Sequence, residues 1–251
     1  MTDDIERELQ EMDAALAAAP ASAPTAEQGS PAWLAERVGH CTASRFKDVM
    51  DFLKSGKEGA KRAGYRMELV VERLTGSATE HYVNDFMAWG TENEPMAIMA
   101  YEAHTGAMVA RKGFIHHPTV PMCGGSVDGL VGEDGIIEIK CPATGTHIKT
   151  LLGAECEHLP QIQGYLWIIG RKWCDFISYD PRLPDGLQLY IQRIARDDDY
   201  VSELAGNVFQ FLAEVDELHQ RLLKIAGPQA VQAPEDSRAP ADSAFDLATQ
   251  A

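Results

Sequence analysis

The chain has 251 residues, of which 45% are hydrophobic, and carries a formal net charge of −16 at pH 7. This length fits one sizeable core, and no apolar run approaches the ~18 residues that a membrane-spanning helix needs. The acidic N-terminal sequence M-T-D-D-I-E-R-E argues against a secretory signal. Five scattered cysteines without a C-x-x-C pair argue against a disulfide framework or a zinc ribbon, and indicate a reducing cytoplasm.

The acidic charge is spread unevenly along the chain. Residues 1–30 carry a net −6 and residues 227–251 a net −3, which leaves −7 for the residues between them. Within that middle part, seven basic side chains oppose three acidic ones from Arg45 to Arg66, a local charge of +4. This segment is either an ordinary solvated helix face or a surface to which DNA contact is confined.

Composition divides the chain into three parts. Residues 1–29 pass into A-A-A-P-A-S-A-P-T, which builds no core, so we expect a mobile arm there. Residues 30–226 alternate between helical and strand patterns, which predicts an α/β or α+β core. Residues 227–251 are rich in Ala, Pro, Gln and acidic side chains, so we expect a disordered acidic tail.

Capping residues and periodicity predict the elements in chain order. Ser30 and Pro31 begin one helix, and Thr42 or Ser44 begins a second that carries apolar residues as far as Leu53. Residues 82–104 are apolar nearly all round, which predicts a buried helix that Pro95 either kinks or interrupts at Glu94. The remaining expected elements are a helix at 65–74, one or two strands within 108–116, a hairpin within 124–142, a loop or short helix with His147 and Lys149, a helix from Pro160, strands at 173–179 and 187–194, and a long amphipathic helix at 197–225.

The hairpin of residues 124–142 has the most informative arrangement of charged side chains. Glu138 and Lys140 share one face of their strand, because strand side chains alternate with period 2. A three-residue loop at 133–135, with Gly135 in the left-handed conformation, pairs Asp128 with Lys140 and places Asp128 on that face. A two-residue turn at 134–135 places Asp128 on the opposite face, and we predict the first of these registers.

Two carboxylates on adjacent strands repel each other unless a positive charge lies between them. Mg²⁺ meets this need with oxygen ligands and retained waters. Lys140 is placed to hold a metal-bound water, so the spacing Asp-x9-Glu-x-Lys indicates metal-dependent phosphodiester hydrolysis. The simpler alternative is a surface hairpin whose acidic side chains are only solvated.

Six motifs in order resemble a known family. They are R-V-G-H-C-T-A-S (37–44), W-G-T-E-N-E (89–94), S-V-D-G (126–129), I-E-I-K-C-P (137–142), P-Q-I-Q-G-Y (160–165) and Y-D-P-R (179–182). Together they resemble the phage lambda exonuclease group of viral alkaline nucleases, also called YqaJ-type recombinases, of the PD-(D/E)xK superfamily. The resemblance covers about residues 30–225. It implies a single domain with a restriction-endonuclease-like core, in which helices flank a central mixed β-sheet.

The resemblance also implies a set of catalytic residues. Asp128 and Glu138 would be metal ligands, with the main-chain carbonyl of Ile139, and Lys140 would be the catalytic lysine. Glu94 matches the acid of the W-G-x-x-x-E helix near the metals, although Glu92 also has apolar neighbours and Pro95 departs from the family pattern. Gln161 matches the glutamine that opens the following helix and orients the lysine or the water. The implied cofactor is Mg²⁺, with Mn²⁺ as a substitute and two ions during catalysis.

A second implied site binds the 5′-phosphate of a DNA end. Arg37, Thr42 and Ser44 would grip the phosphate, where a helix N-terminus, hydroxyl groups and a guanidinium favour an anion. Lys54 occupies the position of a further basic residue of the family, and Met87 that of an apolar wedge between the last base pairs. The bland alternatives are helix capping for Thr42 and Ser44, and a core contact for Met87.

The expected activity is Mg²⁺-dependent 5′→3′ exonuclease digestion of linear double-stranded DNA, which releases 5′-mononucleotides and leaves a 3′ overhang for recombination. The resemblance implies a homotrimeric ring, a phage single-strand annealing protein as partner, no membrane, and action in a bacterial host cytoplasm. Two alternatives remain at this point: a DNA-end-binding scaffold that does not cleave, and a RecB-like nuclease of different polarity. His116, His117 and His147 have no ligand-like spacing and are interpreted as structural, and the Trp167 and Trp173 region as core.

Overall fold

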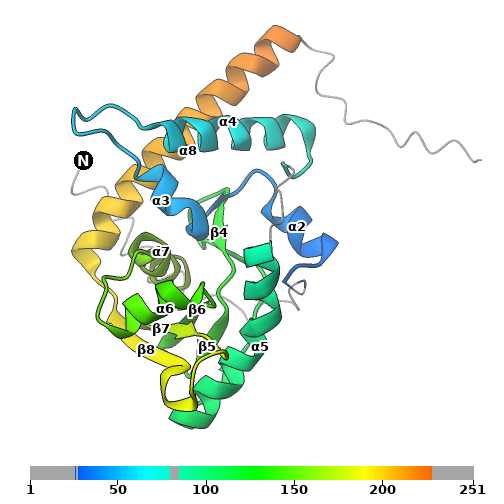
Figure 1. Ribbon diagram of the computed structural model, residues 1–251. Coiled ribbons are helices and arrows are strands. Elements are labelled where there is room, and N and C mark those ends of the chain that lie inside the picture. Colours follow the sequence, from blue (N-terminus) through cyan, green and yellow to red (C-terminus); the bar gives the residue numbers. More distant parts are fainter. Residues whose placement is uncertain (1–25, 27, 80–84, 228–251) are drawn as a thin grey trace, which may run out of the picture.

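The computed structural model describes residue 26, residues 28–79 and residues 85–227. Most of the predicted arm and nearly all of the predicted tail lie outside these residues. A five-stranded mixed sheet is the centre of the described part (Figure 1). Its strands, in spatial order, are β2 (Val109–Ala110), β5 (Gly129–Val131), β6 (Gly135–Lys140), β7 (Trp173–Tyr179) and β8 (Leu189–Ala195). A small sheet orders β1 (Cys41–Thr42), β4 (Cys123–Gly125) and β3 (Ile115–His116).

Helices cover both faces of the five-stranded sheet, which confirms the predicted mixed α/β class. On one face, α7 and α8 share a large core cluster with Ile136 of β6 and Phe176 of β7. On the other face, α5 shares a smaller cluster with Ile137 and Ile139. The helices are α2 (Pro31–Arg37), η1 (Ala43–Arg45), α3 (Phe46–Val49), α4 (Ala60–Thr75), α5 (Asp85–Thr105), α6 (Thr144–Leu151), α7 (Leu159–Ile169), η2 (Asp185–Leu187) and α8 (Asp198–Ala226).

Local sequence explains where the two best-defined helices begin. The Ser30 hydroxyl accepts a hydrogen bond from the Trp33 backbone N–H at 3.2 Å, and Pro31 occupies the first turn, where its missing N–H costs nothing. The Asp197 side chain likewise accepts from the Tyr200 N–H at 3.0 Å and starts α8. Both starts match the sequence prediction.

The helix predicted at 82–104 is present from Asp85 onward, with residues 82–84 outside the described residues, but the prediction that it is buried on all sides is wrong. Within α5, Ala97 and Tyr101 are buried, whereas Met96 and Met99 are 44% and 61% exposed. Only one side of α5 packs on the sheet, so its other apolar side chains have no partner layer among the described residues. The helix continues through Pro95 and so keeps Glu94 in a helical segment.

The second helix is shorter than predicted. It ends at Val49, and Leu53 is 55% exposed. A tight turn follows, in which the Leu53 N–H donates to the Lys57 carbonyl at 2.8 Å and the Gly56 N–H donates to the Leu53 carbonyl at 2.8 Å. This turn prevents the apolar pattern of the segment from forming one continuous helix.

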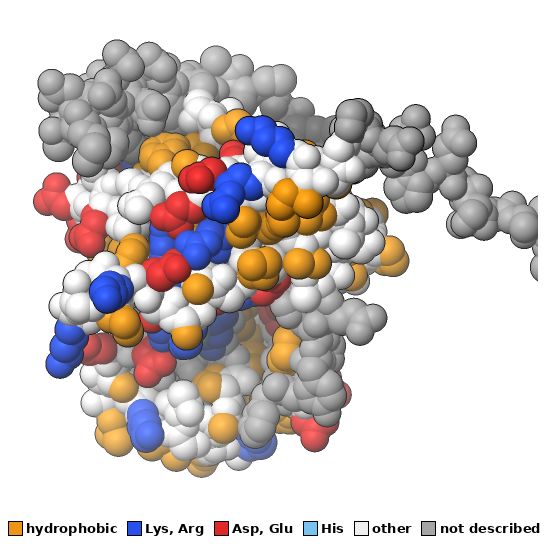
Figure 2. Space-filling model, turned by 90° about the horizontal axis from the view of Figure 1, so that it is seen from above, with side chains coloured by type: hydrophobic (Ala, Val, Ile, Leu, Met, Phe, Trp, Pro, Cys, Tyr) orange, Lys and Arg blue, Asp and Glu red, His pale blue; other side chains and the backbone are white. Residues whose placement is uncertain are grey.

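The basic segment from Arg45 to Arg66 is not a uniform DNA-facing surface. Arg62 is 1% exposed, and its guanidinium donates to the Val49 carbonyl at 2.8 Å and to Glu214 at 2.9 Å. Arg45 and Arg66 are also ion-paired with acidic side chains. On the face seen from above, basic and acidic side chains lie next to each other and form no continuous basic patch (Figure 2). Within the described residues, no helix combines the length and apolar character needed to cross a membrane.

Candidate active site and DNA-end pocket

The central hairpin has a different register from the predicted one. Val131 pairs with Gly135 and Gly129 with Ile137, so the loop is 132–134 and Gly132, not Gly135, has the positive φ of 55°. Gly135 lies within β6, where a Cβ would come within 2.2 Å of the Trp173 ring. The shift is two residues, which is a full strand period. Asp128, directly before β5, therefore stays on the predicted face, level with Glu138 instead of Lys140.

The two carboxylates of the hairpin lie close to one cation and to each other. Glu138 is 1% exposed, and its Oε1 is 2.6 Å from the Lys140 Nζ. The Asp128 Oδ2 accepts a hydrogen bond from the Ile139 N–H at 2.6 Å. Burial, followed by the negative charge of Glu138, raises the pKa of Asp128 well above its usual value. Water loss and like-charge repulsion thus both disfavour the ionised Asp128.

A buried acceptor at this point fits a cation. The Glu138 Oε2 is buried, with no hydrogen-bond partner among the described residues. A buried carboxylate oxygen without a hydrogen-bond partner destabilises the folded protein unless a bound ligand interacts with it. The donor set of two carboxylates and the Ile139 main chain is the hard-oxygen chemistry that Mg²⁺ prefers.

Lys140 remains a charged group in this environment. Burial alone would lower its pKa, but the nearby carboxylates of Glu138 and Asp128 outweigh this effect and raise the pKa above the ordinary lysine value. The ammonium is therefore available as a hydrogen-bond donor and as a fixed positive charge, and not as a base.

Packing of α5 distinguishes the two acidic residues that periodicity left open. Glu92 is exposed, whereas Glu94 is partly buried and close enough to Glu138 and Lys140 to interact with both electrostatically. Burial and then Glu138 raise the pKa of Glu94, while its ion pair with Arg111 acts in the opposite direction. In the described part of the chain, no three His, Cys, Asp or Glu side chains converge as a metal cluster.

Gln161 lies at the start of α7 and contacts Tyr165. Its side-chain amide donates to the Tyr165 hydroxyl at 3.1 Å. Burial, followed by Glu138 and Asp128, raises the pKa of Tyr165 far above its usual value, which places this hydroxyl in the field of both acids. The same tyrosine also interacts electrostatically with Arg37, so it is close to both the carboxylates and the second predicted site.

Arg37, Thr42 and Ser44 line a common cavity of about 490 Å³, together with Met87. The Thr42 hydroxyl is 3.2 Å from that of Ser44 and does not cap η1. The Arg37 guanidinium stacks on the Trp33 ring at 4.4 Å; it forms no salt bridge with a described residue, although Glu72 of the same cavity interacts with it electrostatically. Lys54 lies on the exposed turn between α3 and α4 and does not line this cavity.

Trp33 also lines the cavity, and Ser126 lies behind it in hydrogen-bond contact with Trp33 and Arg37; neither residue was predicted to belong to the site. The Ser126 hydroxyl accepts from the Trp33 Nε1–H at 2.8 Å and from the Arg37 Nη1 at 3.4 Å. Ser126 is 5% exposed and lies two residues before Asp128, so one short segment joins the two sites. Its place in S-V-D-G was the signal that pointed to it.

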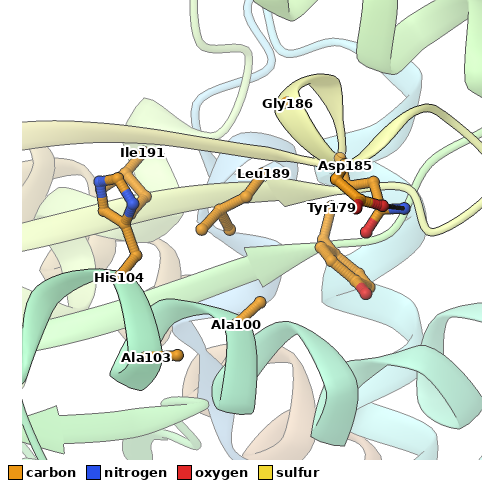
Figure 3. Close-up of a pocket in the computed structure, with 9 residues that line it drawn as sticks. Ala100, Ala103, His104, Tyr179, Asp185, Gly186, Leu189 and Ile191 are labelled. Carbon is orange, nitrogen blue, oxygen red and sulfur yellow. Dashed lines mark hydrogen bonds between the residues drawn. The ribbon is translucent and has the colours of Figure 1, made fainter.

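A larger cavity lies elsewhere on the fold. It measures about 550 Å³ and opens between α5 and the β7–β8 connection. In Figure 3, Ala100, Ala103 and His104 of α5 face Leu189 and Ile191 of β8, with Tyr179 and Asp185 at the other end. None of the predicted site residues lines it, so cavity size does not identify the catalytic site. The remaining lining residues are Gly186 and Gln188.

Two predicted structural histidines have structural roles. The His147 ring is buried, with Nδ1 at 2.7 Å from the Ser178 hydroxyl and Nε2 at 2.8 Å from the Leu187 carbonyl. The His117 Nδ1 accepts backbone N–H groups of Thr119 and Val120. Trp167 is 1% exposed and belongs to the core, as predicted.

Comparisons with known proteins identify the family of the chain. Residues 32–172 match the family model described as YqaJ-like viral recombinase domain. The crystal structure of LHK-Exo, an alkaline exonuclease from Laribacter hongkongensis, has 44% identity over 78% of this chain and 98% of its own, with a TM-score of 0.72. Its complex with dAMP has 43% identity, the same coverage and a TM-score of 0.73.

A more distant structure shares the fold. A phage-related exonuclease from Haemophilus somnus 129PT has 17% identity over 73% of this chain and 96% of its own, with a TM-score of 0.61. At this identity the likeness concerns the fold alone. None of the curated protein sequences matches the chain.

Proposed function

Because the chain belongs to the YqaJ-like viral recombinase family and is a nuclease, we propose that it is a Mg²⁺-dependent 5′→3′ exonuclease of linear double-stranded DNA. It releases 5′-mononucleotides and leaves a 3′ single-stranded overhang for phage-type recombination. The observation that carries the proposal is the buried, unpaired Glu138 Oε2 beside Asp128 and Lys140. These residues bring together a carboxylate oxygen that lacks a hydrogen-bond partner, a second carboxylate and an ammonium group, as a metal-dependent hydrolase requires.

Asp128, Glu138 and the Ile139 carbonyl would hold the metal, with Glu94 beside them. When bound, the ion supplies charge stabilisation at the scissile phosphate and lowers the pKa of a water. Mn²⁺ is the expected substitute, and two ions are expected during catalysis. The like-charge repulsion that raises the pKa of Asp128 supports a requirement for added positive charge at this place.

The chain's own groups position the reactants. The Lys140 ammonium donates hydrogen bonds beside Glu138, where it orients the attacking water and offsets negative charge on the phosphate. Gln161 holds the Tyr165 hydroxyl, and this tyrosine is close to both the carboxylates and Arg37. Gln161 and Tyr165 thereby keep the bound strand end at a fixed distance from the scissile bond.

The second cavity selects the strand end. Arg37 offers a guanidinium that forms no salt bridge with a described residue, and the adjacent hydroxyls of Thr42 and Ser44 can accept or donate hydrogen bonds. This chemistry suits a terminal phosphate. Met87 is 50% exposed and lines the same cavity, which supports its role as a wedge that parts the last base pairs. Lys54 would contact the DNA from its exposed turn outside the cavity.

The assembly and cellular setting complete the proposal. We expect a homotrimeric ring around the DNA and a phage single-strand annealing protein as partner. The five free cysteines support action in a reducing cytoplasm. Measurement of molecular mass in solution tests the ring, because a monomer would exclude it.

The test of the activity uses linear duplex with either a 5′-phosphate or a 5′-hydroxyl, in Mg²⁺ or in EDTA. We expect nucleotide release only with Mg²⁺, and faster release from phosphorylated ends. Lys140→Gln should still bind DNA ends while it releases almost nothing. Release in EDTA would refute metal dependence, and equal rates on both ends would refute the role of Arg37.

A further inference from the structure

The Y-D-P-R motif has no part in the proposed chemistry, yet its arginine joins three separate motifs. Asp180 directly follows β7 and is fully buried. Its Oδ1 accepts from the Arg182 Nε at 2.7 Å and from the Arg182 backbone N–H at 3.0 Å, and its Oδ2 accepts from Nη2 at 2.9 Å. This two-oxygen contact fixes the plane of the guanidinium.

From that position the guanidinium reaches two other elements. Its Nη2 donates to the Pro142 carbonyl at 3.3 Å, two residues beyond Lys140. Its flat face lies 4.3 Å from the centre of the Trp89 ring, in the first two turns of α5. Arg182 therefore ties the end of β7 to the end of β6 and to α5.

The two halves of α5 are held by different contacts. Among the described side chains before Glu94, Glu92 is exposed and Asn93 is buried, whereas the apolar anchors of the helix, Ala97 and Tyr101, come later. Tyr101 is also tied to the sheet, because its hydroxyl donates to Asp175 at 2.8 Å. The second half of α5 is thus held by apolar packing and a hydrogen bond to the sheet, whereas Arg182 contacts the first half at Trp89.

Pro95 weakens the connection between the two halves of α5, next to Glu94 of the proposed site. A proline within a helix has no backbone N–H to donate, so the helical hydrogen bond from position 95 to the Thr91 carbonyl is not made. The turns before Glu94 are therefore less firmly joined to the anchored turns after it. Two contacts from outside the helix reach these turns: the ion pair of Arg111 with Glu94 and the stacking of Arg182 on Trp89.

We propose that Arg182 is a positioning residue of the exonuclease reaction, which holds Trp89 and thereby sets Glu94 relative to Glu138 and Lys140. The inference rests on the proposed function, because it assigns Glu94 to the metal site. Arg182 acts through Trp89 and α5 and does not itself touch the reacting atoms.

The test compares Arg182→Lys with a matched control. Lysine keeps the positive charge beside Asp180, but it lacks the planar guanidinium that pairs with both carboxylate oxygens and stacks on the Trp89 ring. Arg193→Lys is the control, because Arg193 makes the same contacts elsewhere: its guanidinium pairs with Asp175 at 2.8 Å and stacks on Trp173 at 3.6 Å. The two substitutions remove like interactions at different distances from the site.

Two readouts are measured on the full chain. For Arg182→Lys we expect kcat to fall about 10-fold or more, and Mg²⁺ affinity measured by calorimetry without DNA to fall about 10-fold, as for groups that orient metal ligands. KM for 5′-phosphorylated duplex should change by less than about 2-fold, because the substitution leaves the contacts that bind the DNA before the reaction unchanged. Arg193→Lys should leave both kcat and Mg²⁺ affinity near the wild-type values.

Substitution of Trp89 provides a second, independent test. Trp89→Leu removes the stacking partner but leaves the Arg182–Asp180 pair, and it should reproduce the losses even if Arg182→Lys does not fold. Trp89→Phe keeps an aromatic face and should restore most of kcat.

Several outcomes would overturn the proposal. An increase in KM with kcat unchanged would make Arg182 a DNA contact, and equal losses in Arg193→Lys would make the effect one of general stability. Unchanged Mg²⁺ affinity in both Arg182→Lys and Trp89→Leu would also refute it. Failure of the proposed function is distinguishable, because the wild-type chain would then release no nucleotides whatever the calorimetry shows.

Discussion

Asp128→Asn should stabilise the metal-free protein while it abolishes activity. The Asp128 carboxyl is disfavoured in its ionised form by burial and by Glu138, with a smaller contribution of the same sign from Glu94. Lys140 and the Ile139 N–H act in the opposite direction but do not cancel these effects. Asparagine removes the charge and retains an oxygen for the Ile139 N–H, so the repulsion is lost and the hydrogen bond is kept.

The magnitude follows from the repulsion between the two carboxylates. Two unit charges about 5 Å apart at an effective dielectric constant of about 20 repel by roughly 3 kcal/mol, and Lys140 offsets part of this, so a gain on the order of 1–2 kcal/mol is expected at alkaline pH. For a domain of this size that is roughly 2–8 °C in Tm. A carboxyl group whose pKa is raised by folding lowers the free energy of unfolding as pH rises from its ordinary pKa to the raised pKa. The advantage of asparagine should therefore vanish near the ordinary aspartate pKa of about 4 and grow as pH increases.

Added Mg²⁺ should reverse the order of stability. A ligand at 100 times its Kd stabilises the folded state by about 2.7 kcal/mol, and the variant has lost one charged ligand. The assay is thermal unfolding of both proteins in EDTA and in saturating Mg²⁺. Asp175→Asn is the control, because Asp175 is paired with Arg193 and Tyr101 and its substitution should destabilise in both buffers. A lower Tm of Asp128→Asn in EDTA, or an undiminished Mg²⁺ response, would refute the reasoning.

Two further predictions concern the end pocket and the core. Ser126→Ala should raise KM for 5′-phosphorylated duplex about 3- to 10-fold with kcat little changed, since one hydrogen-bonding hydroxyl beside Arg37 is lost; a similar rise on 5′-hydroxyl duplex would contradict a role in phosphate binding. Burial lowers the pKa of His117 to about 4, so unfolding takes up a proton below the ordinary histidine pKa of about 6.5, and stability should fall by roughly 2–3 kcal/mol between these pH values. Urea unfolding over this range should show a flatter profile for His117→Asn, and an unchanged slope would show that His117 is not responsible.

Local sequence determined much of the fold and of the catalytic hairpin. Glu138 and Lys140 share a face because strand side chains alternate, whichever partner strand is present. Helix starts at Ser30 and Asp197 followed from side chains that accept N–H groups within the same turn. Such features depend on neighbours a few residues away, so a sequence read alone predicts them.

Tertiary packing decided the rest, because the deciding contacts come from distant parts of the chain. The hairpin register depends on Gly135 fitting against the Trp173 ring, which belongs to the next strand of the sheet. Arg62 became a core residue and not a DNA contact, because Glu214 of α8 pairs with it. Periodicity could not exclude Glu92, whereas the packing of α5 turned Glu94 toward Glu138. Ser126 joined Trp33 across 93 residues of sequence, and that contact unites the end pocket with the carboxylates.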